Sequence, residues 1–158
     1  MSSRKYTPAG LRRLMARRAP QPTIGVAEAA FNSGFREEES GNVQAARVAY
    51  QVAIDSGVAH QAALAAVNLG VLEYEQGHLP QARVACQVAL DSGIRRQVGQ
   101  AAVNLGDMEK SQGNLHAART AYQRAIDAGM AEQADQAAVE LGALGWTSAH
   151  ADLGRATG

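Results

Sequence analysis

The polar side chains with the most regular spacing in this 158-residue sequence are three asparagines, Asn32, Asn68 and Asn104, which lie 36 residues apart. A carboxamide group can both donate and accept hydrogen bonds. Because asparagine is a poor helix former, three aligned copies indicate a use for the side chain itself. We favour ligand binding over hydrogen bonding to neighbouring helix backbone or to water.

The other reactive side chains do not form a pattern that indicates an enzyme. The sequence contains no GxSxG, P-loop or HExxH motif. The adjacent carboxylates Glu37, Glu38 and Glu39 are typical of a solvated helix end rather than of acid–base chemistry. Cys86 is expected to be a small core residue, because it replaces Tyr50 and Tyr122 of the equivalent segments.

Histidines are too widely spaced along the chain to form a local metal motif. The sequence contains four of them: His60, His78, His116 and His150. We therefore predict a non-catalytic protein with no cofactor and no metal site.

An internal repeat of 36 residues identifies the elements that must position the asparagines. Segments that begin at Gly41, Gly77 and Gly113 superimpose without a gap, and the segments between them superimpose in the same register. Apolar residues in each segment are spaced i, i+3, i+4 and i+7, which places them on one face of an α-helix. We predict helices at 24–40, 43–56, 60–76, 79–92, 96–112, 115–128 and 132–148.

Glycines occur at two kinds of position in this repeat. Gly57, Gly93 and Gly129 follow predicted helices, where a left-handed C-cap residue is expected. A second set lies inside predicted helices, where each glycine costs about 1 kcal/mol relative to alanine. This set consists of Gly34, Gly70, Gly106 and Gly142. We expect a close crossing of paired helices to compensate for the cost, with these glycines facing Ala46, Ala82 and Ala118.

Two repeats share a set of motif residues at matching positions. In one repeat they are Asn68, Leu69, Gly70, Gly77, Ala82, Cys86 and Ala89. In the next repeat they are Asn104, Leu105, Gly106, Gly113, Ala118, Tyr122 and Ala125. This pattern, over about residues 24–148, resembles the tetratricopeptide repeat, although the period is 36 residues where that family has 34. The Sel1-like repeat, which has the same closing glycine, is the alternative.

The resemblance implies an all-α fold, a right-handed α-α superhelix (solenoid) of three helix pairs plus a final capping helix. The repeats are expected at about 24–59, 60–95 and 96–131, with the final helix at 132–148. A basic arm at 1–22 precedes this repeat domain (23–148), and a tail at 149–158 follows it. The first helix of each pair is expected to line a concave groove.

The resemblance also implies that the aligned asparagines hydrogen-bond the backbone of an extended peptide in this groove. Residues four before, three after and seven after each asparagine share its helix face. The predicted groove therefore contains Asn32, Asn68, Asn104, Glu28, Phe35, Glu39, Leu64, Val71, Glu75, Gln100, Asp107 and Glu140. Because this set is acidic and has no lysine or arginine, we expect a neutral or basic peptide rather than the carboxylate tail of a chaperone.

The arm concentrates positive charge at the start of the chain. Its bases are Arg4, Lys5, Arg12, Arg13, Arg17 and Arg18, and it contains no acid. Attachment to nucleic acid or to an anionic membrane through the arm is the alternative function. A solubilising tail, or a helix packed on the first repeat, is the structural alternative. Docking of the arm into the acidic groove of its own or a second copy would make the protein a homo-oligomer or autoinhibited.

No apolar run approaches the ~20 residues that a membrane span needs. We therefore predict a cytoplasmic protein, with an organelle transit peptide at the arginine-rich start as the alternative. The predicted function is a protein–protein interaction or scaffolding module for an unidentified protein or peptide partner.

Overall fold

The computed structural model describes residues 24–156, with the side chains of residues 24–145. This part of the chain is entirely helical, which confirms the predicted all-α class. Its helices are α2 (Ile24–Glu39), α3 (Val43–Asp55), α4 (Ala59–Glu75), α5 (Leu79–Asp91), α6 (Arg95–Ser111), α7 (Leu115–Ala128) and α8 (Ala131–Ala156). None of the described helices is both long enough and apolar enough to cross a membrane.

The ends of α2 to α7 lie within one residue of the predicted ranges. The end of α8 was predicted wrongly, because the helix continues to Ala156 instead of ending at residue 148. Most of the segment assigned to a C-terminal tail, 149–158, is therefore helical. The prediction relied on the length of the repeat, whereas residues 149–156 contain no proline that would end the helix.

Glycines in the left-handed region end the helices, as predicted for three of them. Positive φ angles of 68° to 77° occur at Gly41, Gly57, Gly77, Gly93, Gly113 and Gly129. At Gly77 the glycine N–H donates to the carbonyl of Tyr74 at 2.9 Å, and the N–H of His78 donates to the carbonyl of Glu73 at 2.8 Å. This pair of bonds satisfies the last carbonyls of α4 and turns the chain into α5.

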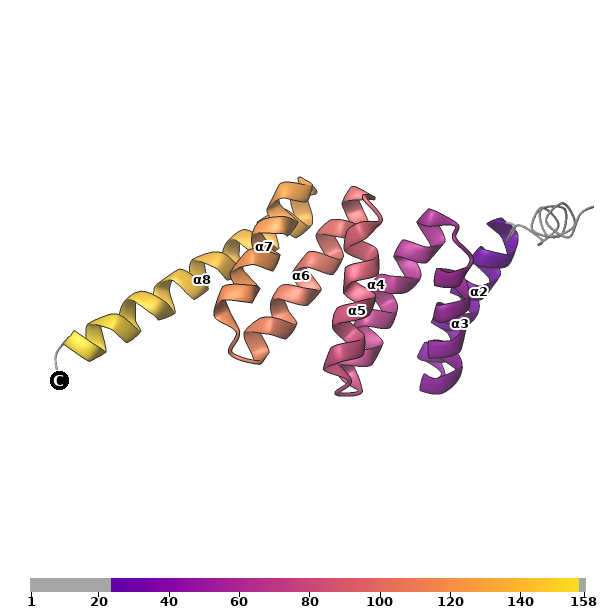
Figure 1. Cartoon of the computed structure of the whole chain (residues 1–158), viewed down its shortest axis with the longest axis horizontal. Helices are drawn as coiled ribbons and strands as arrows, with labels where there is room; N and C mark the ends of the chain where they lie inside the picture. The colour runs from indigo at the N-terminus through magenta and orange to yellow at the C-terminus, as the bar shows by residue number, and fades with distance from the viewer. Residues whose placement is uncertain (1–23, 157–158) are drawn as a thin grey trace, which may run out of the picture.

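The helices stand side by side in a row from α2 to α8 (Figure 1). Consecutive helices pack against each other, and α4 also contacts α2 and α6, just as α6 contacts α8. Among the described residues no such contact joins α3 to α5 or α5 to α7. We call the side formed by α2, α4, α6 and α8 the even-helix face and the opposite side the odd-helix face. Helices are therefore closer together on the even-helix face.

Glycines inside the helices permit close crossings, but the atoms nearest to them are not those of the predicted alanines. A Cβ atom on Gly34 would lie 2.5 Å from the Tyr50 ring, and one on Gly106 would overlap the ring of Tyr122. A Cβ on Gly70 would lie 2.9 Å from the sulfur of Cys86. At the fourth position, Gly142, the space is open.

The alanines that were expected to face the glycines, Ala46, Ala82 and Ala118, are fully buried. Of these, Ala82 does face its glycine, because its carbonyl oxygen would lie 3.5 Å from a Cβ on Gly70. The side chain that covers each glycine comes instead from one turn further along the following helix. The large ring of a tyrosine fits there because the glycine has no side chain.

Two ion pairs at equivalent positions connect successive helix pairs. Arg47 of α3 donates to both carboxylate oxygens of Glu73 on α4, and Arg83 of α5 donates to Glu109 of α6 at 2.5 and 3.0 Å. Glu73 and Glu109 are buried. The hydrogen bond from Arg47 holds the pKa of Glu73 below its ordinary value, and Arg83 does the same for Glu109. These pairs fix each repeat to the next.

Candidate functional site

A pocket of about 400 Å³ lies on the even-helix face, where α4, α6 and the start of α8 meet. Its volume is in the range of known ligand sites. It is lined by Leu64, Val67, Asn68, Val71, Arg96, Gln97, Gln100, Asn104, Glu132 and Gln133. We call it the even-helix pocket. Helical spacing explains the lining, because Leu64, Asn68 and Val71 project from one face of α4 at i, i+4 and i+7.

Five of the predicted groove residues are brought together in this pocket. They are Leu64, Asn68, Val71, Gln100 and Asn104. Most of the face deduced for the second and third repeats therefore corresponds to a single hollow, although Glu75 and Asp107 lie outside it.

The predicted groove residues of the first repeat do not line the pocket. Asn32, Glu39 and Phe35 are exposed, with 47% of Phe35 accessible. Glu28 accepts a hydrogen bond from Gln61 at 3.4 Å.

The remaining acidic groove residues lie outside the pocket, and two of them have partners within the protein. Asp107 accepts a 2.6 Å hydrogen bond from the hydroxyl of Tyr122. Burial, reinforced by this bond, raises the pKa of Tyr122. Glu140 pairs with Lys110 at 2.5 Å, whereas Glu75 is exposed. The basic arm, Arg4 to Arg18, lies outside the described residues.

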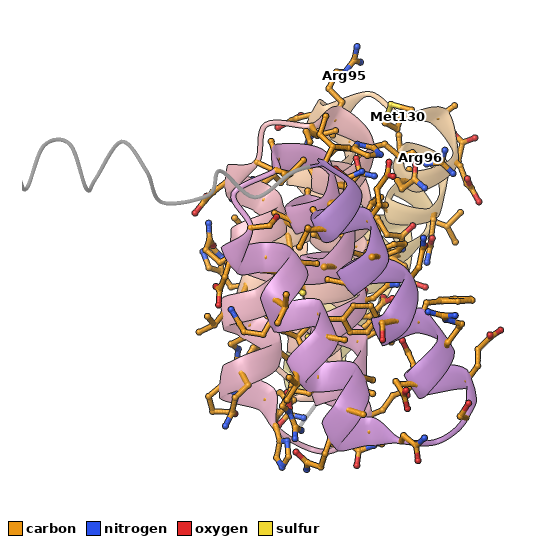
Figure 2. The ribbon with its side chains drawn as sticks, turned by 90° about the vertical axis from the view of Figure 1, so that its right-hand side faces the viewer. Arg95, Arg96 and Met130 are labelled. Carbon is orange, nitrogen blue, oxygen red and sulfur yellow. The ribbon has the colours of Figure 1, made fainter. Side chains whose placement is uncertain are left out.

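The prediction that this surface has no cations was wrong. Arg96 lines the even-helix pocket, and Lys110 neutralises Glu140. In the view along the row, Arg95 projects beyond the ends of the helices (Figure 2). Arg95 donates to the carbonyl of Ala128 at 2.8 Å and so caps the end of α7. The two adjacent arginines therefore belong to different surfaces: Arg95 caps a helix end, and Arg96 lines the even-helix pocket.

Arg96 and Gln97 were missed because the predicted face included only one turn before each asparagine. Gln97 precedes Asn104 by seven residues, which is two helical turns and returns to the same face. Extending the pattern by one more turn would have found both residues.

Three amide side chains form a hydrogen-bonded chain across the floor of the even-helix pocket. Gln133 donates to the Oε1 of Gln100 at 3.3 Å, and Gln100 donates to the Oδ1 of Asn104 at 3.1 Å. The Nδ2 of Asn104, at the end of this chain, is buried without a hydrogen-bond partner among the described residues. Gln97 is 5% exposed, and its Oε1 is likewise buried and unpaired.

Each unpaired buried polar atom costs about 1–3 kcal/mol relative to a paired one. The pocket therefore contains one unpaired donor and one unpaired acceptor, at Asn104 and Gln97. A bound molecule that offers both an acceptor and a donor would recover this free energy.

The second asparagine is bonded within the protein instead. Asn68 donates to the hydroxyl of Tyr50 at 3.3 Å, and this hydroxyl donates to Glu38. The three aligned asparagines therefore have different surroundings, and Asn104 is the one whose buried donor has no partner among the described residues.

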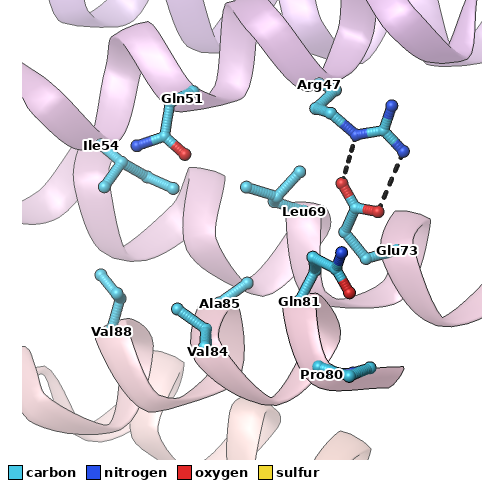
Figure 3. A pocket seen from close by; sticks show the side chains of 10 residues that line it. All are labelled: Arg47, Gln51, Ile54, Leu69, Glu73, Pro80, Gln81, Val84, Ala85 and Val88. Atoms are coloured by element: carbon cyan, nitrogen blue, oxygen red, sulfur yellow. Dashed lines mark hydrogen bonds and ion pairs between the residues drawn. The ribbon is translucent and has the colours of Figure 1, made fainter. Parts of the chain in front are cut away.

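A second hollow, the odd-helix groove, has a volume of about 430 Å³ and lies between α3 and α5. It exists because these two helices do not touch. Val84 and Val88 of α5 face Ile54 of α3 across it, and Leu69 forms its floor (Figure 3). The Arg47–Glu73 pair lies at one end. Its walls are more apolar than those of the even-helix pocket.

The equivalent hollow between α5 and α7 has a volume of about 270 Å³. Thr120 and Arg124 line it at the positions that Val84 and Val88 occupy in the odd-helix groove. The two hollows therefore differ in that a hydroxyl and a guanidinium replace two valines in the second one.

Neither a metal cluster nor a reactive thiol is present among the described side chains. These residues contain no group of three or more His, Cys, Asp or Glu that could hold a metal ion. Cys86 is fully buried in the slot that tyrosine fills in the other repeats, and burial raises its pKa to about 11. The thiol is therefore protonated at neutral pH.

Compared with known proteins, the chain matches no family model and is not significantly similar to any curated protein sequence.

Proposed function

We propose that this chain is a non-catalytic protein-interaction module of the tetratricopeptide type, with a Sel1-like repeat as the alternative family. It binds an extended peptide segment of a protein partner on its even-helix face, and we assign it to the cytoplasm. The 36-residue register and the glycine turns support a right-handed superhelix. Helices that are closer together on one face make the row curve toward that face, so the even-helix face is the concave one.

The even-helix pocket is the observation that carries this proposal. It gathers five predicted groove residues around an unpaired amide donor and an unpaired acceptor. A peptide backbone offers the complementary C=O and N–H groups at every residue. The pocket lining has one positive charge, on Arg96, and one negative charge, on Glu132, and the two cancel. A neutral segment therefore fits better than a strongly charged one.

Alanine substitution of both pocket asparagines tests the proposal. In a pull-down from the native host, Asn68→Ala combined with Asn104→Ala should abolish capture of the partner. A matched control, Gln51→Ala combined with Gln87→Ala, removes two exposed amides from the odd-helix face and should leave capture intact. Equal capture by the wild type and the asparagine variant would refute groove binding.

Attachment of the arm to nucleic acid or to an anionic membrane is the alternative function. It is favoured by the six bases without an acid in residues 1–22. Binding to DNA or to phosphatidylserine vesicles that weakens with salt and disappears on removal of residues 1–22 would support it. Binding that survives this deletion would contradict it.

Self-association is the second candidate. Exposed valines on α3 and α5 flank or line the odd-helix groove: Val48, Val52, Val84 and Val88. A contiguous exposed apolar patch marks a protein interface more often than a free surface. Docking of the arm into a neighbouring copy is a different mode of self-association. Deletion of residues 1–22 distinguishes the two modes, because it removes association through the arm and leaves association through the odd-helix groove.

A further inference from the structure

Buried glutamines form a ladder near the starts of α4, α6 and α8. Gln61, Gln97 and Gln133 lie 36 residues apart and are 9%, 5% and 6% exposed. Two of them donate to a side chain 33 residues earlier, one repeat back: Gln61 to Glu28 at 3.4 Å and Gln133 to Gln100 at 3.3 Å. The ladder is therefore a contact between successive repeats.

The middle step of this ladder is broken. By the same register, the partner of Gln97 is the residue at position 64, where the chain has Leu64. An aliphatic side chain cannot accept the hydrogen bond that Gln61 and Gln133 donate, so the Nε2 of Gln97 has no ladder partner. The Oε1 of Gln97 is buried and unpaired as well. Leu64 and Gln97 both line the even-helix pocket, so the missing bond lies in the pocket wall.

The unpaired donor of Asn104 lies at the end of the amide chain. The two hydrogen bonds of this chain, from Gln133 to Gln100 and from Gln100 to Asn104, point in the same direction. Hydrogen bonds aligned in this way polarise one another, which strengthens the donor at the end of the chain. This donor is the unpaired Nδ2 of Asn104.

We propose that Leu64 leaves the Gln97 amide free to turn, so that Gln97 and Asn104 form a two-point peptide subsite along α6, an inference that rests on the peptide-binding function proposed above. Gln97 accepts a hydrogen bond from a backbone N–H of the peptide, and Asn104 donates one to a backbone C=O. The two residues are seven positions apart, which is about 10.5 Å along a helix. An extended chain rises about 3.3 Å per residue, so the two peptide groups are about three residues apart.

The pocket walls define the chemistry of this three-residue segment. Leu64, Val67 and Val71 form an aliphatic wall, and the opposite charges of Arg96 and Glu132 leave no net charge to pair. The segment is therefore uncharged and carries small aliphatic or hydroxyl side chains. Both unpaired atoms are sealed from solvent in the free protein. When the peptide binds, the Gln97 amide turns about its soft terminal torsion. The side chains around the Nδ2 of Asn104 move aside, and the bond from Gln100 to Asn104 is kept.

Binding of a capped peptide pool to the full-length protein tests the subsite. The probe is a pool of acetylated, amidated hexapeptides of Ala, Val, Thr and Asn, and its tightest member is resynthesised with single N-methyl groups. We expect one N-methyl position to weaken binding about tenfold, because the methyl group replaces the peptide N–H whose hydrogen bond Gln97 accepts. The side-chain NH₂ signals of Gln97 and Asn104 in ¹H–¹⁵N spectra should shift on binding.

Leu64→Gln completes the ladder and provides the matching protein variant. It should raise the melting temperature without peptide, because the new amide accepts a hydrogen bond from the Nε2 of Gln97. It should weaken peptide binding about tenfold, because this bond holds the Gln97 amide in place and its Oε1 can no longer turn toward the peptide. Leu64→Met keeps an aliphatic side chain of similar volume and should bind the peptide as the wild type does.

The outcomes separate this inference from the proposed function. If the peptide binds but Leu64→Gln and all N-methyl variants bind normally, or the Gln97 signals do not move, the subsite is refuted and groove binding stands. If no member of the pool binds and the signals of Asn68 and Asn104 do not move, both proposals fail.

Discussion

Replacing Gly106 by alanine should destabilise the protein, whereas the same change at Gly142 should stabilise it. The two glycines occupy the same position of the repeat. A Cβ at Gly106 would overlap the ring of Tyr122, while one at Gly142 would have no atom within 4 Å. Tyr122 cannot easily move, because it is fully buried and its hydroxyl is bonded to Asp107.

The size of the effect follows from two contributions. Alanine is about 1 kcal/mol better than glycine in a helix, and this gain cancels when the two variants are compared. Overpacking of a core costs about 1–3 kcal/mol, so Gly106→Ala should be less stable than Gly142→Ala by this amount. In a chain of this length each kcal/mol shifts the melting temperature by about 2–4 °C, which makes a 2 kcal/mol difference about 4–8 °C.

Thermal unfolding followed by circular dichroism at 222 nm measures this difference, with urea unfolding as a second measure. Gly70→Ala should fall between the two variants, because its Cβ would meet the sulfur of Cys86 at 2.9 Å. In a Tyr122→Cys background, which copies the second repeat, the cost of Gly106→Ala should fall to that of Gly70→Ala. A Gly106→Ala protein that melts at or above Gly142→Ala would refute the reasoning.

Three further predictions concern the core, the ion pairs and the surface. Cys86 has a pKa of about 11, so iodoacetamide at pH 8 should modify it only after unfolding in urea, as mass spectrometry would show. The pKa of Glu73 is lowered by Arg47 from its ordinary 4.5. The pair therefore stabilises the fold above that pH and loses its effect as the pH falls, so the melting temperature should drop less steeply below pH 4.5 in Glu73→Gln than in the wild type. Val84→Lys should reduce self-association in light scattering, whereas Thr120→Lys at the equivalent position should not; a wild-type monomer at all concentrations would contradict this.

Prediction from the sequence was most successful where the signal is local. Helical periodicity and the glycine turns placed the ends of α2 to α7 within one residue. The same periodicity placed Asn68 and Asn104 on faces that meet in one pocket. These results depend on residues within a few positions of each other, and such positions have a fixed geometry in a helix.

Prediction failed where two distant segments decide the outcome. The partner of Gly34 is the Tyr50 ring rather than Ala46, because the direction of a side chain between packed helices depends on both helices. The odd-helix groove was not predicted, since it depends on the spacing between α3 and α5. Cations near the pocket were missed because Arg96 lies two turns before Asn104.

By itself the sequence determined which residues are helical, where most helices end and which positions are equivalent in successive repeats. Those features follow from backbone hydrogen bonds between residues four apart and from glycine at positions with positive φ. Only the tertiary structure decided that Gln97 and Asn104 have unpaired atoms. A hydrogen bond depends on tenths of an ångström between side chains about 33 residues apart, and this distance is set only when the helices pack.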